Sequence, residues 1–154
     1  MKGIRLACIF GYTKPMSPRQ TALTGEQLEI LGRGAEHFNQ GRFFEAHEEW
    51  EIRWRRLPLP DRPQVQAGIL VCGVSVLLGK GRTSPAARLA RLGVERFAEA
   101  VAASRIHGVP CALALPEAEN RLLRVLARIS LGESDSALLV SELKGLQAVV
   151  NGLS

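Results

Sequence analysis

The sequence predicts an all-α, single-domain protein, a compact bundle of five to six helices with a buried central third helix. Three observations support this prediction. Apolar residues recur at helical spacing, several stretches open with helix-capping residues, and no segment shows the alternation typical of a strand. The length of 154 residues corresponds to one ordinary domain, which can bury a core without disulfides or a structural metal.

The first two helices are delimited by capping and breaking residues. Thr24 and Gln27 have the spacing of a capping box, which predicts that the first helix begins there. Gly41 can adopt the left-handed conformation that ends a helix. The second helix is expected over residues 42–56. It ends at the following Leu-Pro-Leu-Pro stretch, because a residue before proline avoids the helical conformation.

The third helix is expected to be central. It should begin near Asp61, since Asp61 and Gln64 have the spacing of a second capping box. Residues 67–79 are apolar or small on every side, which is typical of a buried helix, and they are too few to span a membrane. Small residues that let a neighbouring backbone approach form one stripe: Gly68, Cys72, Ser75 and Gly79.

Three further helices complete the predicted bundle. Ser84 and Pro85 offer a capping hydroxyl followed by a proline suited to a first turn. Helical spacing of leucine and valine residues indicates two more helices after it. The three are expected to begin near Ser84, Pro116 and Ser134 or Asp135, and to end near Gly108, Gly132 and Val150.

The chain is expected to divide into a poorly ordered tail, residues 1–21, and a single helical domain, residues 22–154. The apolar stretch Leu6–Phe10 is too short for a secretion signal. The cysteines are odd in number and widely spaced, which disfavours a disulfide framework or a zinc knuckle and suits a reducing cytoplasm. They are Cys8, Cys72 and Cys111.

The net charge is +5 and the pI about 9.6, which permits contact with acidic partners. The cations are spread along the chain without an aromatic platform, so the sequence favours a solvated surface over a nucleic-acid or membrane surface. The best basic patch could steer an anionic partner toward the second helix. It consists of Arg53, Arg55, Arg56 and Arg62.

The second helix carries the candidate site. One of its faces is predicted to hold Phe43, His47, Trp50 and Trp54. Glu51 lies beside this face, one turn after His47 and within reach of its imidazole, and Glu48 lies further round. Burying either group alone would cost several kcal/mol, so we expect a bonded His47–Glu51 pair. Gln64 or Gln66 on the third helix could supply further partners.

Three interpretations of this cluster stay open. The first is a buried hydrogen-bonded network that sets how the helices pack. The second is a ligand or metal pocket, in which His47, Glu48 and Glu51 would hold a divalent zinc, manganese or iron ion together with ligands from another helix. The metalloprotease spacing is absent, because position 51 is Glu. The third is acid–base catalysis by His47, oriented by Glu51.

The run from Phe38 to Glu51, together with Trp54, resembles the signature of the family called domain of unknown function 309. The run reads Phe-Asn-Gln-Gly-Arg-Phe-Phe-Glu-Ala-His-Glu-Glu-Trp-Glu. The resemblance covers the chain from about Ala22 through the fourth helix, implies an all-helical bundle and assigns no activity. Leu70 stands where the family tends to carry a second Gln. Aromatic and His positions of the family are replaced here by Ser75, Val76 and Leu77.

Two functions follow as hypotheses. The leading one is a small binding or interaction module built on the buried His/Glu/Trp cluster and Gln66, with an unidentified small-molecule ligand. Such a module could form a homo-oligomer through the small-residue face or the last helix. The competing one is a metal-dependent, hydrolytic enzyme that uses His47, Glu48 and Glu51.

Overall fold

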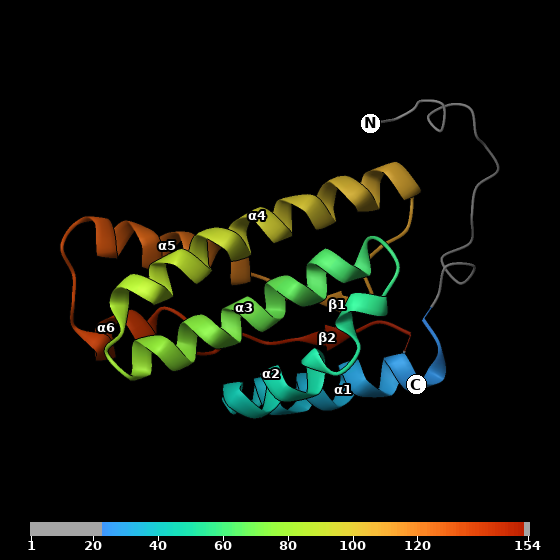
Figure 1. The fold of residues 1–154 in the computed structure, drawn as a ribbon, viewed down its shortest axis with the longest axis horizontal. Helices are drawn as coiled ribbons and strands as arrows, with labels where there is room; N and C mark the ends of the chain where they lie inside the picture. Colours follow the sequence, from blue (N-terminus) through green and yellow to red (C-terminus); the bar gives the residue numbers. More distant parts are fainter. Residues whose placement is uncertain (1–22, 153–154) are drawn as a thin grey trace.

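Helices make up most of the structure, a computed structural model that describes residues 23–152. The expected tail, residues 1–21, lies outside the described residues. Figure 1 shows the arrangement of the elements. In chain order they are α1 (Gly25–Asn39), α2 (Phe43–Glu51), the 3₁₀ helix η2 (Trp54–Arg56), α3 (Asp61–Gly79), α4 (Thr83–His107), β1 (Leu113–Ala114), α5 (Ala118–Ser130), α6 (Ser136–Ser141) and β2 (Val149–Val150).

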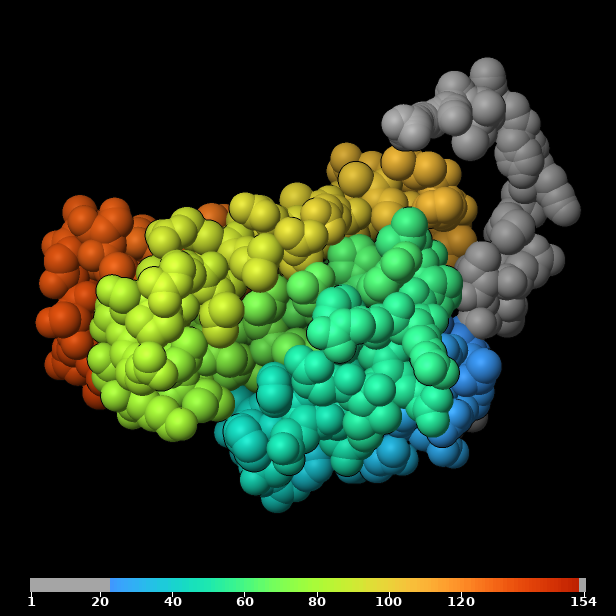
Figure 2. All heavy atoms as spheres, viewed as in Figure 1, coloured from blue at the N-terminus to red at the C-terminus, as the bar shows by residue number. Residues whose placement is uncertain are grey.

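The third helix is central, as predicted. α3 packs along α4 and also contacts α2, η2, α6 and β1. The space-filling view shows atoms of α4 and of the α2–η2 region on either side of α3 (Figure 2). By length and composition alone α3 could cross a membrane, but more than half of its apolar window is buried inside the fold. Its apolar surface is therefore covered by the other helices.

The small-residue stripe of α3 serves packing within the chain. A Cβ atom at Gly68 would lie 3.0 Å from the indole of Trp50 and 3.1 Å from the side chain of Leu115, and Cys72 is fully buried. This part of the stripe is occupied by the protein's own side chains. Self-association through the rest of the stripe or through the last helix stays a prediction.

One of the two predicted capping boxes is present. At the start of α1, the Gln27 amide donates to Thr24 Oγ1 at 3.1 Å and the Thr24 amide donates to Gln27 Oε1 at 2.9 Å. The predicted Asp61–Gln64 box is wrong. Asp61 Oδ1 accepts from the Ala112 amide at 2.6 Å, and Gln64 Nε2 donates to the Leu113 carbonyl. Both side chains bind the segment around β1, which the local spacing does not reveal.

The turn between α3 and α4 shifts the predicted helix start. Gly81 has a φ of +73°, and the Arg82 amide donates to the Leu77 carbonyl at 2.9 Å, so α3 ends in a Schellman motif. The chain is then already reversed, and α4 begins at Thr83 with no side-chain cap. Ser84 is consequently inside the first turn and is not the N-cap that its sequence position predicts.

The last predicted helix is wrong over most of its length. The Asp135 carboxylate caps α6 as expected, but α6 ends at Ser141. The chain turns at Gly145, where φ is +82°, and then forms β2. This strand pairs antiparallel with β1, with Val150 opposite Leu113. Pairing with a segment far away in the sequence outweighs the local helical spacing of the leucines.

Candidate functional site

Trp50 lies in the core, at the point where α1, α2 and α3 meet. Its side chain is 1% exposed and its Nε1 donates to the Leu31 carbonyl at 3.1 Å. The ring lies directly over Gly34 of α1, where a Cβ atom would come within 2.1 Å of Nε1. The ring centroid of Phe38 is 5.7 Å away. Trp50 therefore holds the helices together and is closed to a ligand.

The expected contact between His47 and Glu51 is present, but the pair is only partly buried. His47 Nε2 lies 3.7 Å from Glu51 Oε2, and the two side chains are 36% and 39% exposed. The imidazole stacks on Phe44, which is itself more than half exposed. Because α2 is short and packs through Ala46 and Trp50, the face next to this stripe stays open to solvent. The prediction of a buried His/Glu/Trp cluster is wrong for these two residues.

Glu48 does not join this pair in a metal site. Its side chain is exposed. Between residues 23 and 152, no group of three or more His, Cys, Asp or Glu side chains is arranged to hold a metal ion. His47 and Glu51 are thus only two potential metal ligands, without a third beside them in the described part of the chain.

Trp54 lies outside α2, because α2 ends at Glu51 instead of continuing to Arg56. Residues 54–56 form the separate 3₁₀ helix η2. Trp54 Nε1 donates to Glu51 Oε1 at 3.3 Å. The guanidinium of Arg55 lies 4.8 Å from the centre of the Trp54 ring, in a cation–π contact. Glu51 therefore bridges the imidazole of His47 and the indole of Trp54.

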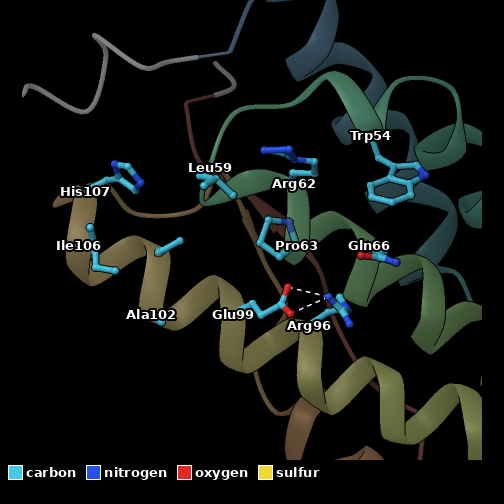
Figure 3. A pocket seen from close by; sticks show the side chains of 11 residues that line it. Trp54, Leu59, Arg62, Pro63, Gln66, Arg96, Glu99, Ala102, Ile106 and His107 are labelled. Carbon is cyan, nitrogen blue, oxygen red and sulfur yellow. Dashed lines mark hydrogen bonds and ion pairs between the residues drawn. The ribbon is translucent and has the colours of Figure 1, made fainter. Parts of the chain in front are cut away.

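Trp54 and Gln66 line a groove that His47, Glu48, Trp50 and Glu51 do not line. The groove has a volume of about 510 Å³ and lies between η2, the first turns of α3 and the last turns of α4. Trp54 and Gln66 stand at one end of it and Ile106 and His107 at the other (Figure 3). The lining consists of Trp54, Leu59, Arg62, Pro63, Gln66, Arg96, Glu99, Ala102, Ala103, Ile106 and His107.

The charges of the groove are unequally paired. Arg96 Nη1 donates to both oxygens of Glu99, at 2.7 and 2.6 Å, and Arg96 Nη2 lies 3.5 Å from Glu95. Within residues 23–152, Arg62 forms no ion pair with a carboxylate. Arg96 thus neutralises Glu99, the only carboxylate that lines the groove. The guanidinium of Arg62 is left without an ion pair in the described part of the chain.

The α4 wall of the groove has no signal in the sequence. The α4 residues of the groove, Glu99, Ile106 and His107, lie more than thirty residues after Arg62. From helical spacing alone they are expected on the outer face of α4. They meet α3 because the two helices pack side by side, which is a tertiary contact. The sequence indicated Trp54, Gln66 and Arg62 as noteworthy, but it did not indicate that they share a groove.

A second polar group near the start of α3 has a structural role. Asp61 is 4% exposed, and burial raises the pKa of its carboxyl group, while the hydrogen bond from Ala112 acts in the opposite direction. Burial, together with the negative charge of Asp61, raises the pKa of the Cys111 thiol to about 12. This thiol is therefore protonated at neutral pH and is a poor nucleophile. The hydrogen bond from the Ala112 amide to Asp61 tethers this segment to α3.

Comparison with known proteins supports the family resemblance. Residues 31–89 match the family model described as Domain of unknown function (DUF309). Over these residues the chain is similar to the DUF309 family. No curated protein and no solved structure matches the chain. The DUF309 segment runs from α1 into the start of α4, so it contains Trp54, Arg62 and Gln66, whereas the α4 wall of the groove lies after it. The family description assigns no activity.

Proposed function

We propose that the protein is a non-enzymatic binding module whose ligand site is the groove beside Trp54. The observation that carries this proposal is the groove itself. Its volume of about 510 Å³ falls within the range of roughly 300–1,000 Å³ that small-molecule sites occupy. Its walls are mostly apolar, with a few convergent polar groups, as in most such sites.

The walls of the groove stand on rigid elements. Pro63 and Gln66 project from the first turns of the central helix α3, and Ala102 and Ala103 from the last turns of α4. The small alanine side chains leave space between the two helices. Sites built on packed helices keep their shape better than sites on loops, which lowers the entropic cost of binding.

The polar groups of the groove suit binding better than proton transfer. Glu99 is held by two charge-assisted hydrogen bonds from Arg96, so its carboxylate is engaged within the protein. His47, the candidate catalytic base, does not line the groove. A general base must reach the proton that it abstracts. Arg62, Gln66 and the Trp54 ring offer charge, hydrogen bonds and stacking surface instead.

The test is to fill the groove. We expect fragments from a small-molecule library to give ligand-observed NMR signals with the wild-type protein, and Ala103→Phe to abolish most of them. Ala98→Phe places the same ring on an exposed part of α4 that does not line the groove, so it should leave the signals unchanged. Absence of any bound fragment, or equal binding to both variants, would overturn the proposal.

A further inference from the structure

We infer that the ligand of the groove is an organic carboxylate with an apolar body. The inference rests on the proposed function, and it adds the chemical class of the ligand. The groove combines a guanidinium that has no acidic partner in the described chain with an aromatic and aliphatic surface. These two features call for a negatively charged head and a hydrophobic remainder.

The charge of the groove selects an anion. Two arginines and one histidine line it, against the single carboxylate of Glu99. Glu99 is bound through both oxygens to Arg96, so these two charges cancel locally. Arg62 is left with a planar set of donors, and a guanidinium binds a carboxylate through two parallel hydrogen bonds. A cationic ligand would face the repulsion of Arg62 with no free carboxylate to compensate.

The backbone beside Arg62 disfavours a phosphate. Phosphate groups bind readily at helix N-termini because free backbone N–H groups point at them. At the start of α3, Pro63 has no N–H, the Arg62 amide already donates to the Pro58 carbonyl at 3.0 Å, and Asp61 adds a carboxyl group. The Arg62 guanidinium is therefore the one group that would bind the anion. Its single positive charge matches the single negative charge of a carboxylate.

The surface around Arg62 accommodates an apolar body. Figure 3 shows Pro63 in the middle of the groove, with Arg62 and Leu59 beyond it and the Trp54 ring at one end. Leu59 is 40% exposed and Ile106 62% exposed, so both present apolar area that a ligand would remove from water. Removing this apolar area from water stabilises a complex. An aromatic ring or a short alkyl chain fits this surface.

A matched pair of ligands tests the head group. 4-Phenylbutyrate and 4-phenylbutanol share the same body and differ in the carboxylate. Their binding is measured by titration of tryptophan fluorescence, with Trp54→Phe giving the background from the closed residue Trp50. We expect the acid to bind the wild-type protein about ten-fold more tightly than the alcohol, the value of a charge-assisted hydrogen-bonded pair.

Two arginine variants locate the effect. Arg62→Gln should remove the preference for the acid and leave the affinity for the alcohol unchanged. Arg88→Gln removes an exposed arginine of α4 that does not line the groove, so it should keep the wild-type preference. Equal loss in both variants would show a general effect of net charge and would overturn the role of Arg62.

The remaining outcomes separate the inference from the proposed function. If acid and alcohol bind the wild-type protein equally, the groove is a binding site and the inference of a carboxylate is wrong. If phenyl phosphate binds more tightly than 4-phenylbutyrate, the choice of carboxylate over phosphate is wrong. If none of the three ligands binds and Ala103→Phe also removes no fragment signal, the proposed function itself fails.

Discussion

At the scale of single residues, Trp50 packs against Gly34 where α2 meets α1. The indole occupies the place where any side chain at position 34 would begin, and its N–H satisfies the Leu31 carbonyl of the same helix. Because protein interiors pack at crystal density, this ring has little room to move. The contact fixes α2 on α1, and with it the position from which Glu51 reaches Trp54.

This contact predicts a large effect of one methyl group. Gly34→Ala should lower the free energy of unfolding by about 2–3 kcal/mol, because the new Cβ atom would overlap a buried ring. Gly25→Ala is the matched control in the same helix, since a Cβ atom there meets nothing within 4 Å. Urea denaturation measures both. A loss for Gly34→Ala no larger than that of the control would contradict the packing described.

Glu51 makes two contacts at the surface, and their value is small. Glu51→Ala removes the acceptor of Trp54 Nε1 and the partner of His47. Because both side chains of the ion pair are more than a third exposed, solvent screens the interaction, and the expected loss of stability is below about 1 kcal/mol. A loss of several kcal/mol in thermal or urea unfolding would mean that the pair is buried after all.

Asp61 predicts a pH dependence of stability. Its pKa in the folded protein is raised above 3.8, so its protonated form is favoured in the folded state. The stability that this proton provides is fully present below the unfolded-state pKa and is lost as the pH rises through the folded-state pKa. Asp61→Asn stays neutral and keeps an acceptor for the Ala112 amide.

The asparagine variant should therefore gain stability relative to the wild type as the pH rises from about 4 to about 7. Urea denaturation of both proteins across this range gives the difference. A difference that does not change with pH would contradict the raised pKa. Asp61→Ala is the informative companion, because it loses the acceptor and should destabilise the protein at every pH.

At the scale of the elements, Asn39 ties the C-terminal strand to α1. Its Nδ2 donates to the Ala148 carbonyl at 3.0 Å, and its Oδ1 accepts from the Ala148 amide at 2.6 Å. The side-chain amide thus pairs with the backbone as a neighbouring strand would. Since β2 has only two residues, this pair is a substantial part of what holds the segment after α6 in place.

Asn39→Ala should lower the free energy of unfolding by about 1–3 kcal/mol, because Ala148 loses both partners. It should also accelerate hydrogen exchange of the Ala148 amide before the rest of the protein opens. Asn120→Ala, at an exposed position of α5, is the control and should change neither. Unchanged exchange at Ala148 in Asn39→Ala would show that the strand is held by other contacts.

The helices whose limits depend on local signals are those that the sequence predicts well. The capping box at Thr24 and the apolar length of α3 are both encoded within a few residues, and the structure has both. The stretch 142–150 was predicted as helix and is not, because its conformation depends on β1 and on Asn39. Such pairing partners lie far away in the sequence, and helical periodicity contains no information about them.

The candidate site follows the same rule. His47 and Glu51 are one helical turn apart, and the predicted contact between them is present. Its burial depends on what packs over α2, and the prediction of burial failed. The sequence places Trp54 on the same helix face as His47 and offers Gln66 as a further partner. In the structure α2 ends at Glu51, and both side chains line the groove. The α4 wall of that groove could not be predicted, because only the packing of α3 on α4 creates it.

At the scale of the whole molecule, most of the net positive charge lies in the first 21 residues of the sequence. The first 21 residues contain no acidic residue, and four cations, Lys2, Arg5, Lys14 and Arg19, out of a net charge of +5. The helical part is therefore close to neutral. Selection of an anion in the groove must come from local pairing at Arg62 and Glu99, and not from a general positive field.

The central claim is that a small organic carboxylate binds in the groove beside Trp54. The most direct measurement is the change in ¹H–¹⁵N NMR spectra of the labelled protein on addition of 4-phenylbutyrate. The chain has two tryptophans, so the indole N–H signals of Trp50 and Trp54 can be followed separately. We predict that the Trp54 indole, the Gln66 side-chain amide and the backbone of residues 102–107 shift, while the Trp50 indole does not. Shifts confined to the surroundings of His47 and Phe44, or no shifts at all, would contradict the account.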